Sequence, residues 1–151
     1  MLRTQLADAL KEAMRSKNER GISTLRLILA ALKDRDIAAR AKGNYDGISE
    51  DEIRGMMQSM IKQRRESIAL YEQGGRCELA QQEAEEIAVI ESFLPKQLSD
   101  EEIERAARDL IAEIGATGIK DMGRTMAAMK QRYAGKMDFS KASGVVKQLL
   151  A

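Results

Sequence analysis

The side chains that could carry chemistry in this chain are mainly carboxylates and amines, because the sequence contains no histidine and one cysteine. Without imidazole there is no Ser-His-Asp or Cys-His catalysis and no histidine metal ligand. The single thiol, Cys77, excludes an intramolecular disulfide and a CxxC zinc or redox motif. With neither a histidine base nor a second thiol available, we predict that Cys77 is not catalytic.

A short glutamate-rich stretch suggests acid–base or metal chemistry. Its carboxylates are Glu83, Glu85, Glu86 and Glu91. Glu83 and Glu86 are three residues apart and share a helix face, as ligands of a di-metal site do. However, the next position on that face is the apolar Ile90, and the histidine of a Glu-x-x-His motif is missing. We therefore predict ion pairs with basic helices, and neither a metal nor any other cofactor.

Phosphate-binding loops are also absent from the sequence. It contains neither the Gly-x-x-x-x-Gly-Lys-[Ser/Thr] pattern nor a Gly-x-Gly-x-x-Gly turn after a strand. Gly115 and Gly118 join two predicted helices and have no strand before them. The sequence gives no support to nucleotide binding.

Basic residues gather toward the C-terminal end, although the whole chain carries only +1. Residues 121–147 include six basic residues and only two acidic ones. The six are Arg124, Lys130, Arg132, Lys136, Lys141 and Lys147. Such side chains on adjacent helices can neutralise RNA phosphates. The alternative is a solvated face that keeps a small domain soluble.

A second basic group lies in the N-terminal part of the chain. It comprises Lys62, Arg64, Arg65 and Arg76. Acidic residues surround this group, so we predict structural salt bridges. Arg26 and Lys33 are seven residues apart and share one helix face. For these two, a phosphate contact and pairing with the acidic stretch around residue 85 both stay open.

The elements that position these residues are predicted to be helices throughout. Aromatic residues make up 3% of the 151 residues and proline occurs once, which disfavours a β-sandwich or barrel. A first amphipathic helix starts at Leu2, and we expect Gly21 to break it and Ser23 to cap the second. Ser49 opens a capping box for a third helix, which Gly74 and the glycine after it end.

Pro95 is predicted to stop a fourth helix and to mark a domain boundary. Three shorter helices follow, at about 99–114, 121–133 and 140–150, the first opened by a capping box at Ser99. The expected fold is all-α: a helical N-terminal domain of about four helices, residues 1–95, followed by a small three-helix bundle, residues 96–151.

The sequence predicts a cytoplasmic protein without a membrane segment. No apolar run approaches the roughly 20 residues that span a bilayer. The first residues lack a hydrophobic signal core, and Asp8 and Glu12 are atypical of a transit peptide.

Several segments resemble the YqeY family, in that family's order and over nearly the whole chain. They begin at Leu25-Arg26-Leu27, Lys62-Gln63-Arg64, Glu83-Ala84-Glu85, Phe93-Leu94-Pro95-Lys96-Gln97-Leu98 and Asp121-Met122-Gly123-Arg124. YqeY-like proteins are similar to the C-terminal tail of the B subunit of the glutamine-dependent aminoacyl-tRNA amidotransferase, which helps to hold tRNA. One departure is Glu78, where the family commonly has aspartate. Glutamate caps helices less well, which bears on the start of the fourth helix.

The resemblance implies a non-catalytic accessory protein that binds tRNA or an aminoacyl-tRNA complex through its basic C-terminal bundle. Two alternatives stay open. The chain could assist glutamine-dependent carbon–nitrogen ligation, with a further protein subunit as partner, or act as a helical protein–protein adaptor. It has no catalytic constellation of its own, so whether it counts as an enzyme stays open too.

Overall fold

The computed structural model describes all residues, 1–151, as seven α-helices and one 3₁₀ turn with no strand. The all-α fold class predicted from the sequence is confirmed. The chain divides into two compact units, Met1–Leu94 and Pro95–Ala151. No helix has the combination of length and apolarity that crossing a membrane requires.

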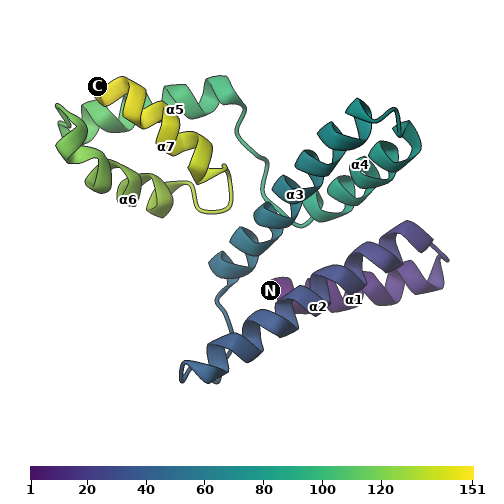
Figure 1. Cartoon of the computed structure of the whole chain (residues 1–151). Coiled ribbons are helices and arrows are strands. Elements are labelled where there is room, and N and C mark those ends of the chain that lie inside the picture. Colours follow the sequence, from purple (N-terminus) through teal and green to yellow (C-terminus); the bar gives the residue numbers. More distant parts are fainter. The chain divides into compact units, whose positions relative to one another are not determined.

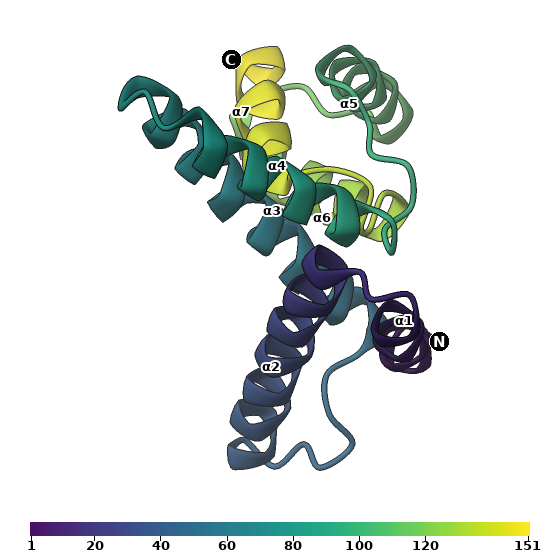
Figure 2. The ribbon, with the colours of Figure 1, turned by 90° about the vertical axis from the view of Figure 1, so that its right-hand side faces the viewer.

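The first unit consists of two helical hairpins. Helices α1 (Leu2–Arg15) and α2 (Glu19–Ala41) form one hairpin, and α3 (Glu50–Gln73) and α4 (Cys77–Glu91) form the other. The second hairpin crosses the N-terminal part of α2, and the C-terminal part of α2 extends beyond it (Figures 1 and 2).

The core of the first unit lies where the two hairpins meet. Its most buried side chains come from all four helices and include Leu6, Ile28, Ile53, Met57 and Ile90, each with none of its surface exposed. They recur at helical spacing, so each helix turns one apolar stripe inward and leaves charged residues outside. Packing of these stripes, rather than the stability of any single helix, holds the unit together.

The helix start predicted around Gly21 and Ser23 is wrong. α1 ends at Arg15, and α2 begins at Glu19, where the Asn18 side chain accepts a hydrogen bond of 3.0 Å from the Gly21 N–H. Gly21 therefore lies in the first turn of α2. A Cβ there would come within 2.7 Å of the Asn18 side-chain nitrogen, so a larger residue would displace this cap.

The predicted end of the fourth helix at Pro95 is also shifted. α4 ends at Glu91. After it the chain makes a tighter turn, in which the N–H groups of Phe93 and Leu94 donate hydrogen bonds to the carbonyls three residues earlier, those of Ile90 and Glu91. A proline disfavours the helical conformation in the residue before it, so the helix ends before the proline rather than at it. By contrast, both predicted capping boxes, at Ser49 and Ser99, are present.

An ionic clamp joins the start of α1 to the second half of α2. Arg3 donates two hydrogen bonds to the Asp36 carboxylate, at 2.7 and 2.8 Å, and a third to the carbonyl of Ile48 at 2.9 Å. The Ile48 N–H donates to Asp36 at 3.0 Å, which holds the end of the α2–α3 loop. Hydrogen bonds from Arg3 are the main cause that lowers the pKa of Asp36 to about 2.

A second ionic network joins α2, α3 and α4. The Glu86 carboxylate accepts a hydrogen bond of 2.9 Å from Arg64 of α3 and lies 3.8 Å from Arg20 of α2. The side chains of Arg64 and Glu86 are 12% and 11% exposed, so the pair is largely buried. Arg64 also lies 3.9 Å from Glu83, whose pKa is raised by burial and by the neighbouring Glu86. Arg20 further bonds Glu85 at 3.1 Å.

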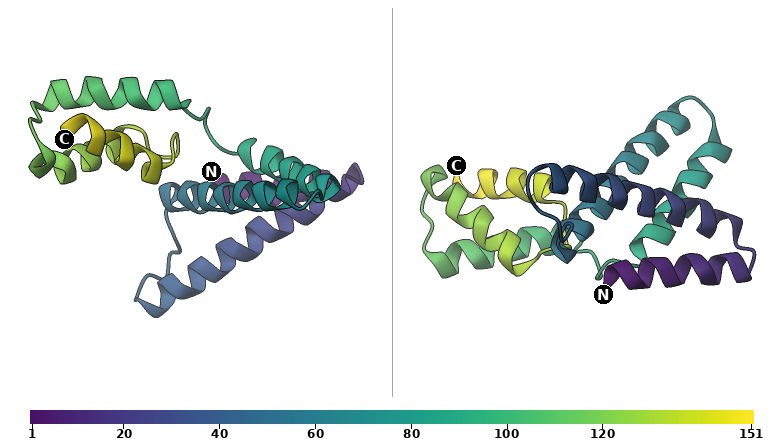
Figure 3. Two further views of the ribbon diagram at one scale, coloured as in Figure 1. Left: turned by 45° about the horizontal axis from the view of Figure 1, so that its top comes forward. Right: turned by 90° about the horizontal axis from the view of Figure 1, so that it is seen from below.

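The second unit contains α5 (Asp100–Ile114), a 3₁₀ turn η1 (Ile119–Asp121), α6 (Met122–Arg132) and α7 (Phe139–Leu150). Within it, α5 lies over the pair formed by α6 and α7 (Figure 3). Its core includes Ala107, Met129, Met137, Ala142 and Val146, all with at most 1% of their surface exposed. α5 ends at Gly115, which has the left-handed conformation (φ +70°) that favours glycine.

Removing the Glu86 carboxylate should destabilise the chain more than removing its exposed neighbour. Glu86→Ala leaves the buried Arg64 guanidinium without its closest partner, so we expect the free energy of unfolding to fall by about 2–4 kcal/mol. Glu85→Ala removes an exposed pair and should cost less than about 1 kcal/mol. Urea denaturation of both variants measures the difference, and equal losses would contradict the role assigned to Glu86.

The clamp at Asp36 should give a pH-dependent contribution to stability. A pKa lowered from 3.8 to about 2 means stabilisation that is complete above the ordinary pKa and is lost as the pH falls toward 2. Because Arg3 is partly exposed and screened by solvent, we expect Asp36→Asn to cost only about 1 kcal/mol at pH 7. Denaturation from pH 7 to 2.5 should show the difference from the parent shrinking below about pH 4; a constant difference would contradict the assignment.

Because it has its own core and caps, we predict that the second unit folds alone. A chain of residues 95–151 should show helical circular dichroism and a cooperative, though weak, thermal transition, since so short a chain buries little surface. Amide resonances confined to the random-coil region in an NMR spectrum would instead indicate one continuous folding unit.

Candidate nucleic-acid interface

The six basic residues predicted to contact RNA all lie exposed on the second unit. They lie on α6, in the α6–α7 turn and on α7: Arg124, Lys130, Arg132, Lys136, Lys141 and Lys147. Lys130 and Arg132 are two positions apart on α6, which places them on nearly opposite sides of the helix. These two side chains therefore do not belong to one row along α6.

Three of the six are engaged in ion pairs that the sequence analysis did not foresee. Arg132 donates two hydrogen bonds to Glu113 of α5, at 2.7 and 2.9 Å, and they lower the pKa of Glu113. Lys141 pairs with Asp100 of α5 at 2.8 Å. Both pairs cross between helices, so they tie α6 and α7 to α5.

Arg124 forms the third pair, with Asp121 on the preceding turn at 3.1 Å. Asp121 also accepts a hydrogen bond of 2.9 Å from the Thr117 N–H, and this backbone bond is the largest cause that lowers the pKa of Asp121. The spacing of three residues was visible in the sequence, so this pair could have been predicted.

The other three, Lys130, Lys136 and Lys147, have no carboxylate within salt-bridge distance. The backbone at Lys136 is nevertheless held firmly. Its carbonyl accepts a hydrogen bond of 2.8 Å from the Leu98 N–H, and the carbonyl of Gly135 accepts one of 2.7 Å from the Gln97 side chain. These bonds fix the α6–α7 turn against the residues that precede α5, and the exposed amine of Lys136 projects from this fixed backbone.

The carboxylates considered for acid–base or metal chemistry are instead bonded to arginines. Glu83, Glu85 and Glu86 belong to the network with Arg20 and Arg64, and Arg65 pairs with Glu91 at 3.1 Å. The structure brings together no group of three or more acidic or cysteine side chains suited to a metal ion. The prediction of ion pairs for these glutamates is confirmed.

Arg64, Arg65 and Arg76 of the second basic group form ion pairs, as predicted. Arg64 and Arg65 pair with carboxylates of α4, and Arg76, directly before α4, pairs with Glu78 in its first turn at 2.7 Å. Arg26 and Lys33 differ, because neither reaches a carboxylate. Arg20, six positions before Arg26 on α2, makes the contacts to α4 that the sequence left open for them.

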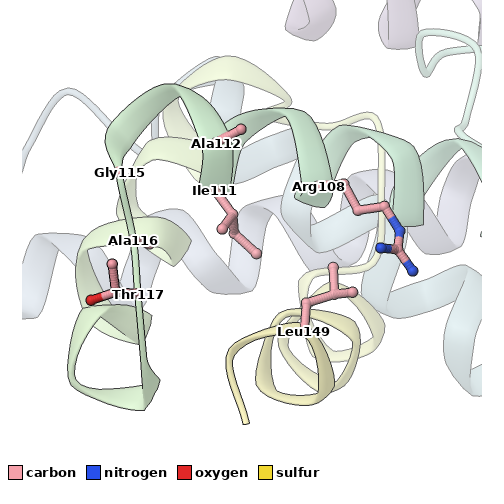
Figure 4. Close-up of a pocket in the computed structure, with 7 residues that line it drawn as sticks. All are labelled: Arg108, Ile111, Ala112, Gly115, Ala116, Thr117 and Leu149. Atoms are coloured by element: carbon pink, nitrogen blue, oxygen red, sulfur yellow. The ribbon is translucent and has the colours of Figure 1, made fainter.

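A hollow that the sequence analysis missed lies between α5 and α7. It has a volume of about 320 Å³ and is open to solvent on one side. Its lining, drawn in Figure 4, is Arg108, Ile111, Ala112, Gly115, Ala116, Thr117 and Leu149. The polar group at its edge, Arg108, is bonded to Glu104 at 2.8 Å. The lining offers one hydroxyl, on Thr117, and no general base to activate it, so the hollow suits an apolar side chain better than a reaction.

Comparison with known proteins agrees with the resemblance described above. The family model described as "Yqey-like protein" matches residues 3–150. Among curated proteins, the chain is similar to "Altered inheritance of mitochondria protein 41, mitochondrial" from several organisms. It is 29% identical over 120 residues to the protein of Vanderwaltozyma polyspora, covering 75% of this chain and 62% of that protein.

The protein of the same name from Clavispora lusitaniae is 32% identical over 109 residues, which is 71% of this chain and 61% of the relative. That from Eremothecium gossypii is 29% identical over 114 residues, 74% of this chain and 60% of the relative. The chain thus spans about three fifths of the length of these relatives. Because the family model covers nearly all of its length, the chain belongs to the YqeY family.

Proposed function

We propose that the second unit binds tRNA, or a complex that contains aminoacyl-tRNA, through contacts with phosphates. The observation that carries this proposal is the set of exposed lysines without a carboxylate partner, Lys130, Lys136 and Lys147. An amine that is already neutralised gains little from a phosphate, whereas a free one releases counterions when it binds. The fixed backbone at Lys136 lowers the entropy lost when that side chain becomes ordered.

The ion-paired residues take a secondary part in this proposal. Arg124, Arg132 and Lys141 are all about half exposed, and exposed pairs contribute only about 0–1 kcal/mol. A phosphate can therefore replace or share the carboxylate, at the cost of leaving Glu113 or Asp100 close to RNA. We expect these three to contribute less to affinity than the free lysines.

The chain contributes binding rather than bond-making in this proposal. If it assists glutamine-dependent carbon–nitrogen ligation, a separate enzyme supplies the reacting groups and this chain holds the RNA. The relatives carry "mitochondrial" in their names, whereas the sequence favours the cytoplasm. The proposal requires only a compartment that contains tRNA.

An adaptor function is the second candidate, and the hollow between α5 and α7 favours it. Ile111 and Leu149 line that hollow, and Ile119 nearby in the chain is 53% exposed. A partner that inserts an apolar side chain there would bury this surface. Such binding depends weakly on salt, which separates it from binding to phosphates.

Replacement of the free lysines provides the test. For the triple variant Lys130→Gln, Lys136→Gln and Lys147→Gln, we expect a much weaker affinity for total tRNA. The slope of log K against log salt should become shallower by about 2–3 units if all three contact phosphates. Thermal stability should be nearly unchanged, because exposed charges contribute little to it. Filter binding or gel shifts at several salt concentrations measure both quantities.

The matched control removes the same charge from the ion-paired positions. For Arg124→Gln, Arg132→Gln and Lys141→Gln together we expect a change in slope clearly smaller than that of the free-lysine variant. If both triple variants bind tRNA with the parent's affinity and slope, the basic residues form only a solvated surface, and the adaptor function takes precedence.

A further inference from the structure

The outer face of α2 carries exposed residues at the spacing of a coiled-coil seam. Successive members are alternately four and three positions apart, and all are exposed: Ser23, Leu27, Ala30, Asp34, Ile37 and Ala41. Leu27 is 50% exposed and Ile37 56%, which is high for side chains of this size. Much of α2 lies clear of α3 and α4 in Figure 2. An alternation of three and four is the pattern with which one helix packs along another.

A row of positive charge runs beside this seam. Arg26, Lys33 and Arg40 recur every seven residues, each directly before a seam residue, and span about 21 Å along the helix. In heptad terms they occupy the g positions, where charges select the partner of a coiled coil.

These three cations are available for a partner. The salt bridges of α2 use Arg20 toward α4 and Asp36 toward Arg3, and none involves the row. Asp36 is the only acidic residue three or four positions from a member of the row, and it is held by two hydrogen bonds from Arg3. The charge of Arg40 adds to the lowering of the Asp36 pKa, but no member of the row forms a salt bridge within the first unit.

We propose that the outer face of α2 docks an amphipathic helix of another protein, one with small or apolar residues along its seam and glutamate or aspartate along its flank. This surface lies on the first unit and is independent of the proposed tRNA contacts. The positive charges of Arg26, Lys33 and Arg40 require negative charges along the flank of the partner helix. The small side chains at Ser23, Ala30 and Ala41 allow the backbone of the partner to approach closely. Asp34, inside the seam, favours a partner with a basic or amide side chain opposite, which sets the register.

The same face argues against two other occupants. A second copy of α2 packed antiparallel would place basic row against basic row. Packed parallel, it would place the row against Thr24, Ala31 and Ala38, which carry no charge. RNA would use the cations but leave the exposed Leu27 and Ile37 without a function.

Synthetic helices can test this proposal before any natural partner is known. The probe is a labelled three-heptad peptide with leucine along the seam and glutamate at both flanks; its matched control carries lysine at both flanks. Fluorescence anisotropy with the full chain should show the acidic peptide binding at least tenfold more tightly than the basic one. Equal affinities, or no binding of the acidic peptide, would overturn the proposal.

A charge-reversed variant makes the test specific to α2. In the triple variant Arg26→Glu, Lys33→Glu and Arg40→Glu, the preference should invert toward the basic peptide. The control Lys96→Glu, Arg105→Glu and Lys120→Glu makes the same change in net charge on exposed residues of the other unit and should keep the parent's preference. Inversion by the control, or none by the α2 variant, would show attraction to overall charge and overturn the proposal.

A third variant, Ile37→Asp, tests the apolar seam without altering the row. It should weaken binding of the acidic peptide at least fivefold while circular dichroism shows unchanged helix content.

Two further measurements distinguish the proposed partner helix from RNA and from a second copy of this chain. If the α2 reversal weakens tRNA binding and leaves peptide binding intact, the row is an RNA surface. If sedimentation shows a dimer that Ile37→Asp dissociates, the occupant is a second copy. Either result overturns the proposal.

Discussion

The first unit depends on a carboxylate that is almost removed from solvent. Glu86 receives a hydrogen bond from Arg64 on one side and lies beside Arg20 on the other, so one side chain links three helices. A buried ion pair adds little net stability compared with apolar packing, but it is specific, because any other arrangement leaves a charge unpaired. The network favours the helix register in which Arg20 and Arg64 both reach Glu86. The outer face of α2 is held in place by the same contacts.

Local signals made much of the fold predictable. The capping boxes at Ser49 and Ser99 depend on residues three apart, so the sequence alone identifies them. The predicted start of α2 is wrong because glycine usually breaks helices, whereas here Gly21 lies in the first turn and donates its N–H to the Asn18 cap. Errors of this kind arise where a tertiary or side-chain contact overrides an average preference.

The sequence predicts which basic residues make up the candidate site, but not which of them are paired with carboxylates. Counting residues identified a basic end, and a net excess of cations is indeed present there. The pairings of Arg132 with Glu113 and of Lys141 with Asp100 join residues that are 19 and 41 positions apart. No local pattern reveals them, because they depend on how α6 and α7 cross α5. The number of free cations is therefore a property of the fold, and half of the predicted residues lose part of their electrostatic value through it.

The clamp at Asp36 has a consequence for chain length. Because Asp36 binds the Ile48 N–H, the end of the α2–α3 loop is fixed independently of the residues before it. The side-chain hydrogen bonds of the tip between Gly43 and Gly47 are local: Asn44 donates to the carbonyl of Gly47 and accepts from the N–H of Asp46. Doubling the length of such a loop costs only about 0.6 kcal/mol in closure entropy. This tip is accordingly a suitable place to insert a fluorescent reporter or an epitope without disturbing either hairpin.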